Sequence, residues 1–119
     1  MESNGLIAWI ENWIEGVQPD IIRTHDPDVE PAIDHDEPHL DHIDHIYTAK
    51  FVQEAAKSFP SIPVYAYMGY PIRYQATNVS PELTQQKLAM WRKYQEIDTS
   101  VAGEQWDIAM SRCYKRRIQ

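Results

Sequence analysis

The hydrophobic residues near the N-terminus repeat at helical spacing. They fall within an arc of about 160° when successive residues are placed 100° apart. These residues are Leu6, Ile7, Trp9, Ile10, Trp13, Ile14 and Val17. Ser3 or Asn4 is placed to cap a helix and Gly16 to stop it. The pattern predicts an amphipathic helix, and we assign Trp9 and Trp13 to the core.

Two short apolar stretches predict strands. Pro19 breaks the helical pattern, and residues 20–24, with Ile21 and Ile22 at their centre, then predict a short buried strand that ends at His25. Residues 63–68 form the second such stretch. The acidic, proline-broken segment from Asp26 to Pro38 predicts a loop.

Three further segments predict helices. Asp41 or a near neighbour is placed to cap one helix, whose apolar residues are Ile43, Ile46, Tyr47 and Phe51. Ser80 and Pro81 begin the next, with an apolar face of Leu83, Met90, Trp91 and Tyr94. We assign Met90 and Trp91 to the core. A last helix is expected from about Glu104 to Arg116.

The order of these elements favours an α/β fold, with a partial Rossmann-like parallel sheet and flanking helices in a single domain over residues 1–119. Short strands separated by helices are typical of crossover units. Two strands make a narrow sheet with unpaired edges. We therefore expect a missing segment or another chain to complete the sheet.

Composition excludes several classes of function. A net charge of -7 over 119 residues argues against a nucleic-acid surface, so the basic tail, residues 112–117, is interpreted as a solvated helix end. No apolar run reaches the length of a membrane span, and the N-terminus lacks the pattern of a signal peptide. We expect a cytoplasmic protein. The single cysteine, Cys113, is interpreted as incidental rather than as a nucleophile.

Histidines and acids gather in one stretch of the chain. All 5 histidines are confined to residues 25–45. They are His25, His35, His39, His42 and His45. Residues 26–44 hold many acids and no Lys or Arg. Imidazole and carboxylate are common zinc ligands, so the cluster is consistent with a metal site, and a solvated acidic loop stays the alternative.

The segment His39-Leu40-Asp41-His42 lies between a predicted strand and a predicted helix. Loops at this position in parallel sheets often hold ligands and catalytic groups. On the predicted helix His42 lies at the edge of the buried face, whereas His45 points away from it. We therefore expect His42 to bind the metal and His45 to be solvated.

Several segments together resemble the PIG-L/LmbE-like zinc-dependent N-deacetylases. They are Pro19 to His25, then His39-Leu40-Asp41-His42 leading into a helix, the strand at Val64 to Tyr67, and the region from Asn78 to Gln95 with Lys87 in a helix. The resemblance covers roughly residues 5–95, and the order of the segments makes it more specific than the His-x-Asp-His motif alone.

The resemblance implies roles for three residues. His42 would be a zinc ligand, His39 would act as an acid or stabilise an oxyanion, and Asp41 would orient and tune a histidine. The implied reaction is zinc-dependent hydrolysis of the N-acetyl amide of an N-acetylglucosamine-type sugar or conjugate.

One motif of the family is absent from the sequence. The family's Ala-His-Pro-Asp-Asp segment supplies two metal ligands and the general base, and nothing like it occurs here. Candidate replacements are His25, Asp34, His35 and Asp36. The chain is then a piece of a longer enzyme, an enzyme completed in a homo-oligomer, or a degenerate, non-catalytic metal-binding or interaction module.

Overall fold

The computed structural model describes residues 3–32, 40–101 and 103–119. It divides into two compact units, one of Met1–Pro71 with Lys115–Gln119 and one of Ile72–Tyr114. A compact unit need not be a separate domain. The expectation of a single domain over residues 1–119 therefore stays a prediction.

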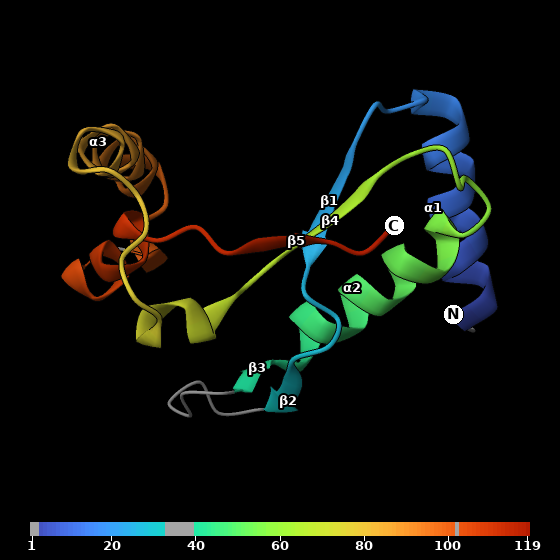
Figure 1. Ribbon diagram of the computed structural model, residues 1–119, viewed down its shortest axis with the longest axis horizontal. Coiled ribbons are helices and arrows are strands. Elements are labelled where there is room, and N and C mark those ends of the chain that lie inside the picture. Colours follow the sequence, from blue (N-terminus) through green and yellow to red (C-terminus); the bar gives the residue numbers. More distant parts are fainter. Residues whose placement is uncertain (1–2, 33–39, 102) are drawn as a thin grey trace. The chain divides into compact units, whose positions relative to one another are not determined.

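The first unit is a small mixed sheet with helices against it. β1 (Ile22–His25) pairs in parallel with β4 (Val64–Tyr67), and β5 (Lys115–Arg117) pairs antiparallel on the other side of β4. α2 (Ile43–Ala56) packs on β1 and β4, and α1 (Ser3–Val17) packs on α2 (Figure 1). The mixed α/β class is confirmed for the described residues.

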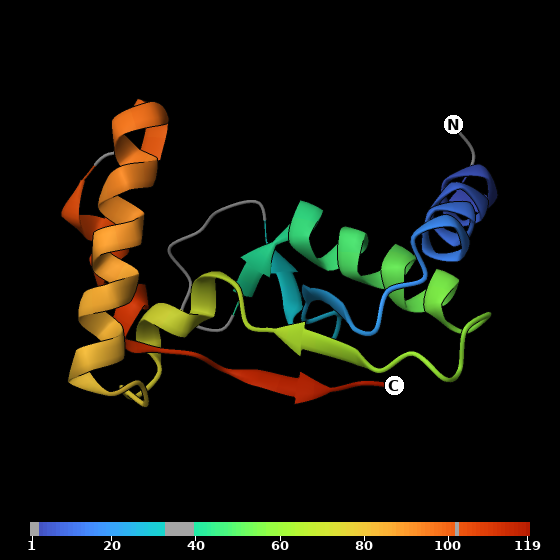
Figure 2. The same ribbon diagram turned by 90° about the horizontal axis from the view of Figure 1, so that it is seen from above.

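A second, two-stranded sheet stands at the start of α2. β2 (Glu30–Ala32) pairs in parallel with β3 (Leu40–His42), and α2 follows β3 directly (Figure 2). The His42 side chain caps the helix, because its Nδ1 accepts a hydrogen bond from the Asp44 N–H at 3.2 Å. β3 thus places Asp41 next to the first turn of α2.

The core of the first unit consists mainly of small and β-branched side chains. Its most buried apolar members are Ile46, Ala49, Ala55, Ala56, Val64 and Ala66, with Ile14 from α1. Alanines at the contact let α2 lie close to its neighbours. Gln119 contacts the C-terminal end of α2, where its Nε2 donates hydrogen bonds to the carbonyls of Ala56 and Phe59 at 3.0 Å each.

Four expectations about the elements are wrong. Part of the predicted loop, Glu30–Ala32, is strand β2. The predicted last helix is a 3₁₀ helix, η3 (Glu104–Ser111), and the basic tail continues as β5. Arg116 of β5 is held by ion pairs to Asp26 and Asp28, and a charged strand suits the edge of a sheet. The antiparallel β5 also makes the sheet mixed rather than purely parallel.

Three large apolar side chains that were assigned to the core are exposed. Trp9 is 57% exposed, Trp13 65% and Met90 74%. On α1, only one side of the broad apolar arc meets α2, and Ile14 there is 8% exposed. The width of an apolar arc therefore does not show how much of it is covered.

The second unit is built around α3 (Pro81–Ile97), which packs on η3 and on η2 (Thr99–Val101). The predicted start of α3 is confirmed, because Ser80 Oγ accepts the Leu83 N–H and Pro81 occupies the first turn. Another 3₁₀ helix, η1 (Tyr70–Tyr74), joins the units along the chain. None of the described helices combines the length and apolar composition needed to cross a bilayer.

Candidate metal site

Three potential metal ligands meet in the first unit. His25 ends β1, Asp41 lies in β3 and His45 lies in the first turn of α2. Each offers one ligand atom, and these three atoms lie within 4.8 Å of one another. Two imidazoles and a carboxylate form a ligand set that divalent transition metals accept. We call this group the His25–Asp41–His45 cluster.

Asp41 is the buried member, with 1% of its surface exposed. Its Oδ1 accepts the N–H of His42 at 2.8 Å and the N–H of Tyr70 at 3.3 Å, and it lies 2.8 Å from His45 Nδ1. Its Oδ2 is buried and has no hydrogen-bond partner among the described residues. A buried carboxylate oxygen without a partner is costly, and a cation would satisfy it.

The contact with Asp41 sets the chemistry of His45. With a carboxylate as acceptor, His45 Nδ1 carries the proton, so the lone pair lies on Nε2 and is free to bind a metal. The ring lies 4.9 Å from that of Tyr70, and the side chain is 26% exposed. The expectation that His45 is solvated is therefore wrong.

His25 stacks on His45, with ring centroids 4.0 Å apart and planes inclined by 1°. Burial and the neighbouring His45 lower the pKa of His25, although the charge of Asp41 acts in the opposite direction. A lowered pKa keeps His25 neutral near pH 7. The neutral imidazole is the form that binds a metal.

The three candidate ligands lie close together but are not yet arranged as in a bound site. Metal–ligand bonds of about 2.0–2.2 Å place tetrahedral ligand atoms roughly 3.3–3.6 Å apart. An imidazole lone pair lies in the ring plane, so two parallel rings do not both aim at one ion. Binding therefore requires one histidine ring of the stacked pair to tilt and the ligand atoms to move closer together.

Gly69 makes room for the carboxylate. It follows β4, and a Cβ at this position would lie 2.0 Å from Asp41 Oδ2 and 2.7 Å from Asp41 Cγ. The Tyr70 N–H, one residue later, holds Oδ1 of the same carboxylate. The turn after β4 can therefore hold Asp41 in this position only while residue 69 has no side chain.

No family model, curated protein or solved structure matches the chain. The role of the cluster therefore has to be inferred from its own residues.

The structure places the predicted site residues in different surroundings. Asp41 lies in the cluster, whereas His42 caps α2, with its ring 5.7 Å from that of His45. His39 lies outside the described residues, as do three of the candidate replacement ligands, Asp34, His35 and Asp36. His25, the fourth candidate, is in the cluster. The roles of His39, Asp41 and His42 stay predictions.

The lowered pKa of His25 predicts how stability depends on pH. The unfolded chain takes up the proton first as the pH falls below 6.5, the ordinary pKa of histidine. The stability contributed by neutral His25 is fully present above about pH 6.5 and is lost as the pH falls toward the lowered folded-state pKa. Urea unfolding of the chelator-treated protein between about pH 5 and pH 8 measures this loss.

The matched variant is His25→Gln, which has no titrating group at this position. Its stability should fall less than that of the wild type over the same pH range. Parallel curves for the two proteins would mean that His25 does not cause the dependence.

Proposed function

We propose that the His25–Asp41–His45 cluster binds a divalent metal ion, with zinc as the first candidate. The observation that carries this proposal is the buried Asp41 carboxylate: it lies within 4.8 Å of ligand atoms of His25 and His45, and its Oδ2 has no partner among the described residues. Oxygen and imidazole nitrogen are ligands that zinc accepts, and three protein ligands leave a position for substrate or water.

We further propose that the metal serves the hydrolysis of an N-acetyl amide, with an N-acetylglucosamine-type sugar or conjugate as substrate. Asp41 belongs to the segment His39-Leu40-Asp41-His42, which resembles the PIG-L/LmbE-like N-deacetylases. When bound, zinc supplies Lewis-acid polarisation of a carbonyl and activation of water near neutral pH.

The residues themselves have separate tasks in this proposal. Asp41 holds His45 in one tautomer and offers its second oxygen as a ligand. Burial keeps His25 neutral and thus ready to bind. His42 is the ligand that the resemblance implies, and a cap to α2 is the role that its contact with Asp44 indicates.

A second function is favoured by one observation in the sequence. The Ala-His-Pro-Asp-Asp segment that supplies two ligands and the general base in the family is absent. Without a general base, a metal-bound chain would be a binding or interaction module that does not turn substrate over. This alternative shares the metal cluster with the first and differs only in catalysis.

Acetate release decides between the two. The zinc-loaded chain is incubated with N-acetylglucosamine, and acetate and free amine are measured together, with the chain's mass recorded in the same buffer. The enzyme proposal predicts equal amounts of both products and a rate at least about 100-fold lower for Asp41→Asn. Stoichiometric zinc binding without release of acetate would support the non-catalytic binding module. Absence of zinc binding would contradict both the enzyme and the module.

A further inference from the structure

The sheet of the first unit has an open edge at β1. Among the described strands, β1 pairs only with β4. The N–H groups of Ile22 and Asp26 donate to Pro63 and Tyr67 across that pair. Because alternate residues of a strand direct their backbone groups to opposite edges, the N–H and C=O of Arg23 and His25 face the open edge. Such an edge is a template for another strand.

A trough runs beside this edge. One hollow of about 370 Å³ lies between α1 and α2, and it is lined by Leu6, Trp9, Ile10, Trp13, Ile14, Thr48, Phe51 and Val52. A second, of about 340 Å³, is lined by Arg23, Thr24, His25, Thr48, Val52 and Tyr67. Thr48 and Val52 of α2 line both. The two hollows are therefore neighbours, and we call them together the trough; its lining residues extend from the tryptophans of α1 to β1.

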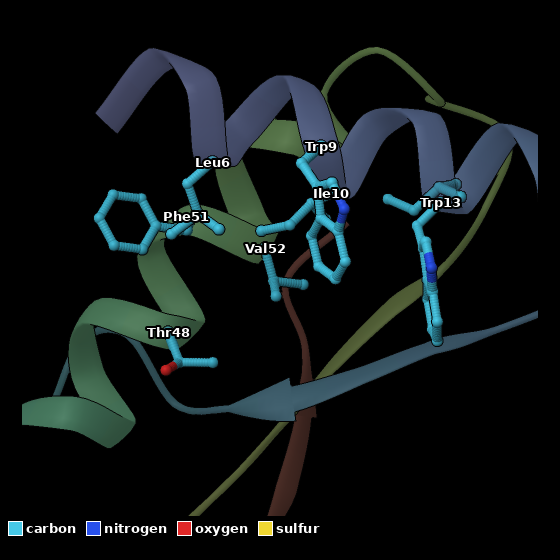
Figure 3. Close-up of a pocket in the computed structure, with 8 residues that line it drawn as sticks. Leu6, Trp9, Ile10, Trp13, Thr48, Phe51 and Val52 are labelled. Atoms are coloured by element: carbon cyan, nitrogen blue, oxygen red, sulfur yellow. The ribbon is translucent and has the colours of Figure 1, made fainter. Parts of the chain in front are cut away.

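The hollow between α1 and α2 has mainly apolar walls, whereas Arg23, Thr24 and His25 add polar groups to the second hollow. Figure 3 shows the indole rings of Trp9 and Trp13 descending from α1, with Val52 and Thr48 pointing into the same space from α2. The indole rings stack with centroids 5.9 Å apart, although more than half of each residue is exposed. Large exposed apolar patches of this kind mark binding surfaces. Alternate side chains of an added strand would fill the trough.

The positive charge of Arg23 at the open edge indicates which kind of strand would pair with β1. Arg23 is exposed and forms no ion pair with any other described residue. A second copy that paired through its own β1 would bring Arg23 close to another Arg23 or His25, and like charges across a strand pair are unfavourable. An acidic residue opposite Arg23 is complementary.

We propose that the open edge of β1 binds an extended segment of another polypeptide, different in sequence from β1. The segment adds a strand to the sheet, places apolar residues at alternate positions in the trough, and carries an acidic residue opposite Arg23. Backbone hydrogen bonds supply affinity in this mode of binding, and the trough and Arg23 supply specificity. The proposal does not depend on metal binding or catalysis.

The test uses a capped peptide of about eight residues that alternates valine and threonine around one central glutamate. A second peptide has lysine in place of the glutamate, and a third is N-methylated at every backbone amide. Affinities for the metal-free chain are measured by tryptophan emission at low salt. The proteins are the wild type, Arg23→Glu and Lys50→Glu, the last a charge reversal on an exposed residue of α2 that does not line the trough.

The wild type should prefer the glutamate peptide by about threefold to tenfold, because exposed charge pairs are individually weak. Arg23→Glu should reverse this preference and Lys50→Glu should keep it. The N-methylated peptide should not bind. Equal binding of the N-methylated peptide would overturn strand addition, and so would absence of binding to all three. A dimer of the chain that dissociates on Arg23→Glu would identify the occupant as a second copy instead.

Discussion

Asp41→Asn is expected to lower the affinity for zinc by more than about 100-fold while changing the stability of the metal-free chain by less than about 1 kcal/mol. Asparagine keeps the oxygen that accepts the His42, Tyr70 and His45 contacts, so the hydrogen bonds to Oδ1 survive. It replaces the unpartnered Oδ2 by an amide nitrogen, which does not bind a metal. A metal-binding role and a structural role for this carboxylate are thereby separated.

Isothermal titration with zinc measures the first effect and urea unfolding the second. The informative comparison is His45→Ala with His42→Ser, because serine preserves the helix cap while it removes the imidazole. If the His25–Asp41–His45 cluster binds the metal, the His45→Ala variant should lose its affinity for zinc and the His42→Ser variant should keep it. The reverse pattern would place the metal at the ligand implied by the family resemblance. A loss of several kcal/mol in metal-free Asp41→Asn would mean that the charge of Asp41 is structural.

Gly69→Ala should damage both the fold and the site. The added Cβ would lie 2.0 Å from Asp41 Oδ2, a distance at which one of the two groups must move. Overpacking of this kind costs about 1–3 kcal/mol, and displacement of the carboxylate should weaken zinc binding by at least about tenfold. Thermal unfolding and zinc titration of the same preparation measure the two effects.

The chain offers a matched control in Gly16. A Cβ there meets nothing within 4 Å, and Gly16 lies inside α1. The expectation that Gly16 stops this helix is wrong, because α1 continues to Val17 and the residue with a positive φ is Gln18. Gly16→Ala should therefore raise stability by about 0.5–1 kcal/mol through the higher helix propensity of alanine, with zinc binding unchanged. If Gly69→Ala were as well tolerated as Gly16→Ala, the close approach of the turn to Asp41 would not be required.

Elements with strong local signals were predictable from the sequence. The apolar spacing of α1 and the Ser80–Pro81 start of α3 fix those helices, and both predictions are confirmed. β5 was missed because three consecutive basic residues carry no strand pattern. The strand exists because Arg116 pairs with Asp26 and Asp28, residues far away in the sequence, and because β4 has a free edge there. Such tertiary causes are invisible to periodicity.

The site was predictable only in part. Asp41 was singled out by its motif and lies in the cluster. His45 was excluded because its direction was judged from the buried face of α2, whereas it meets Asp41 from β3 and His25 from β1. The closeness of Asp41 and His45 in the sequence is a signal that could have paired them, because β3 runs directly into α2. The exposure of Trp9 and Trp13 could not be predicted, because the apolar arc of a helix does not show which other element packs against it or how much of it is covered.

The most direct test of the metal cluster is a zinc titration of the metal-stripped chain, observed through the imidazole signals of its histidines by NMR. The cluster predicts that the signals of His25 and His45 change together and that the change is complete at about one equivalent of zinc, since both rings bind the same ion. The His42 signal should change little. A gradual, parallel drift of all the histidine signals, without an end point at one equivalent, would contradict a built site and leave an acidic surface that attracts cations weakly.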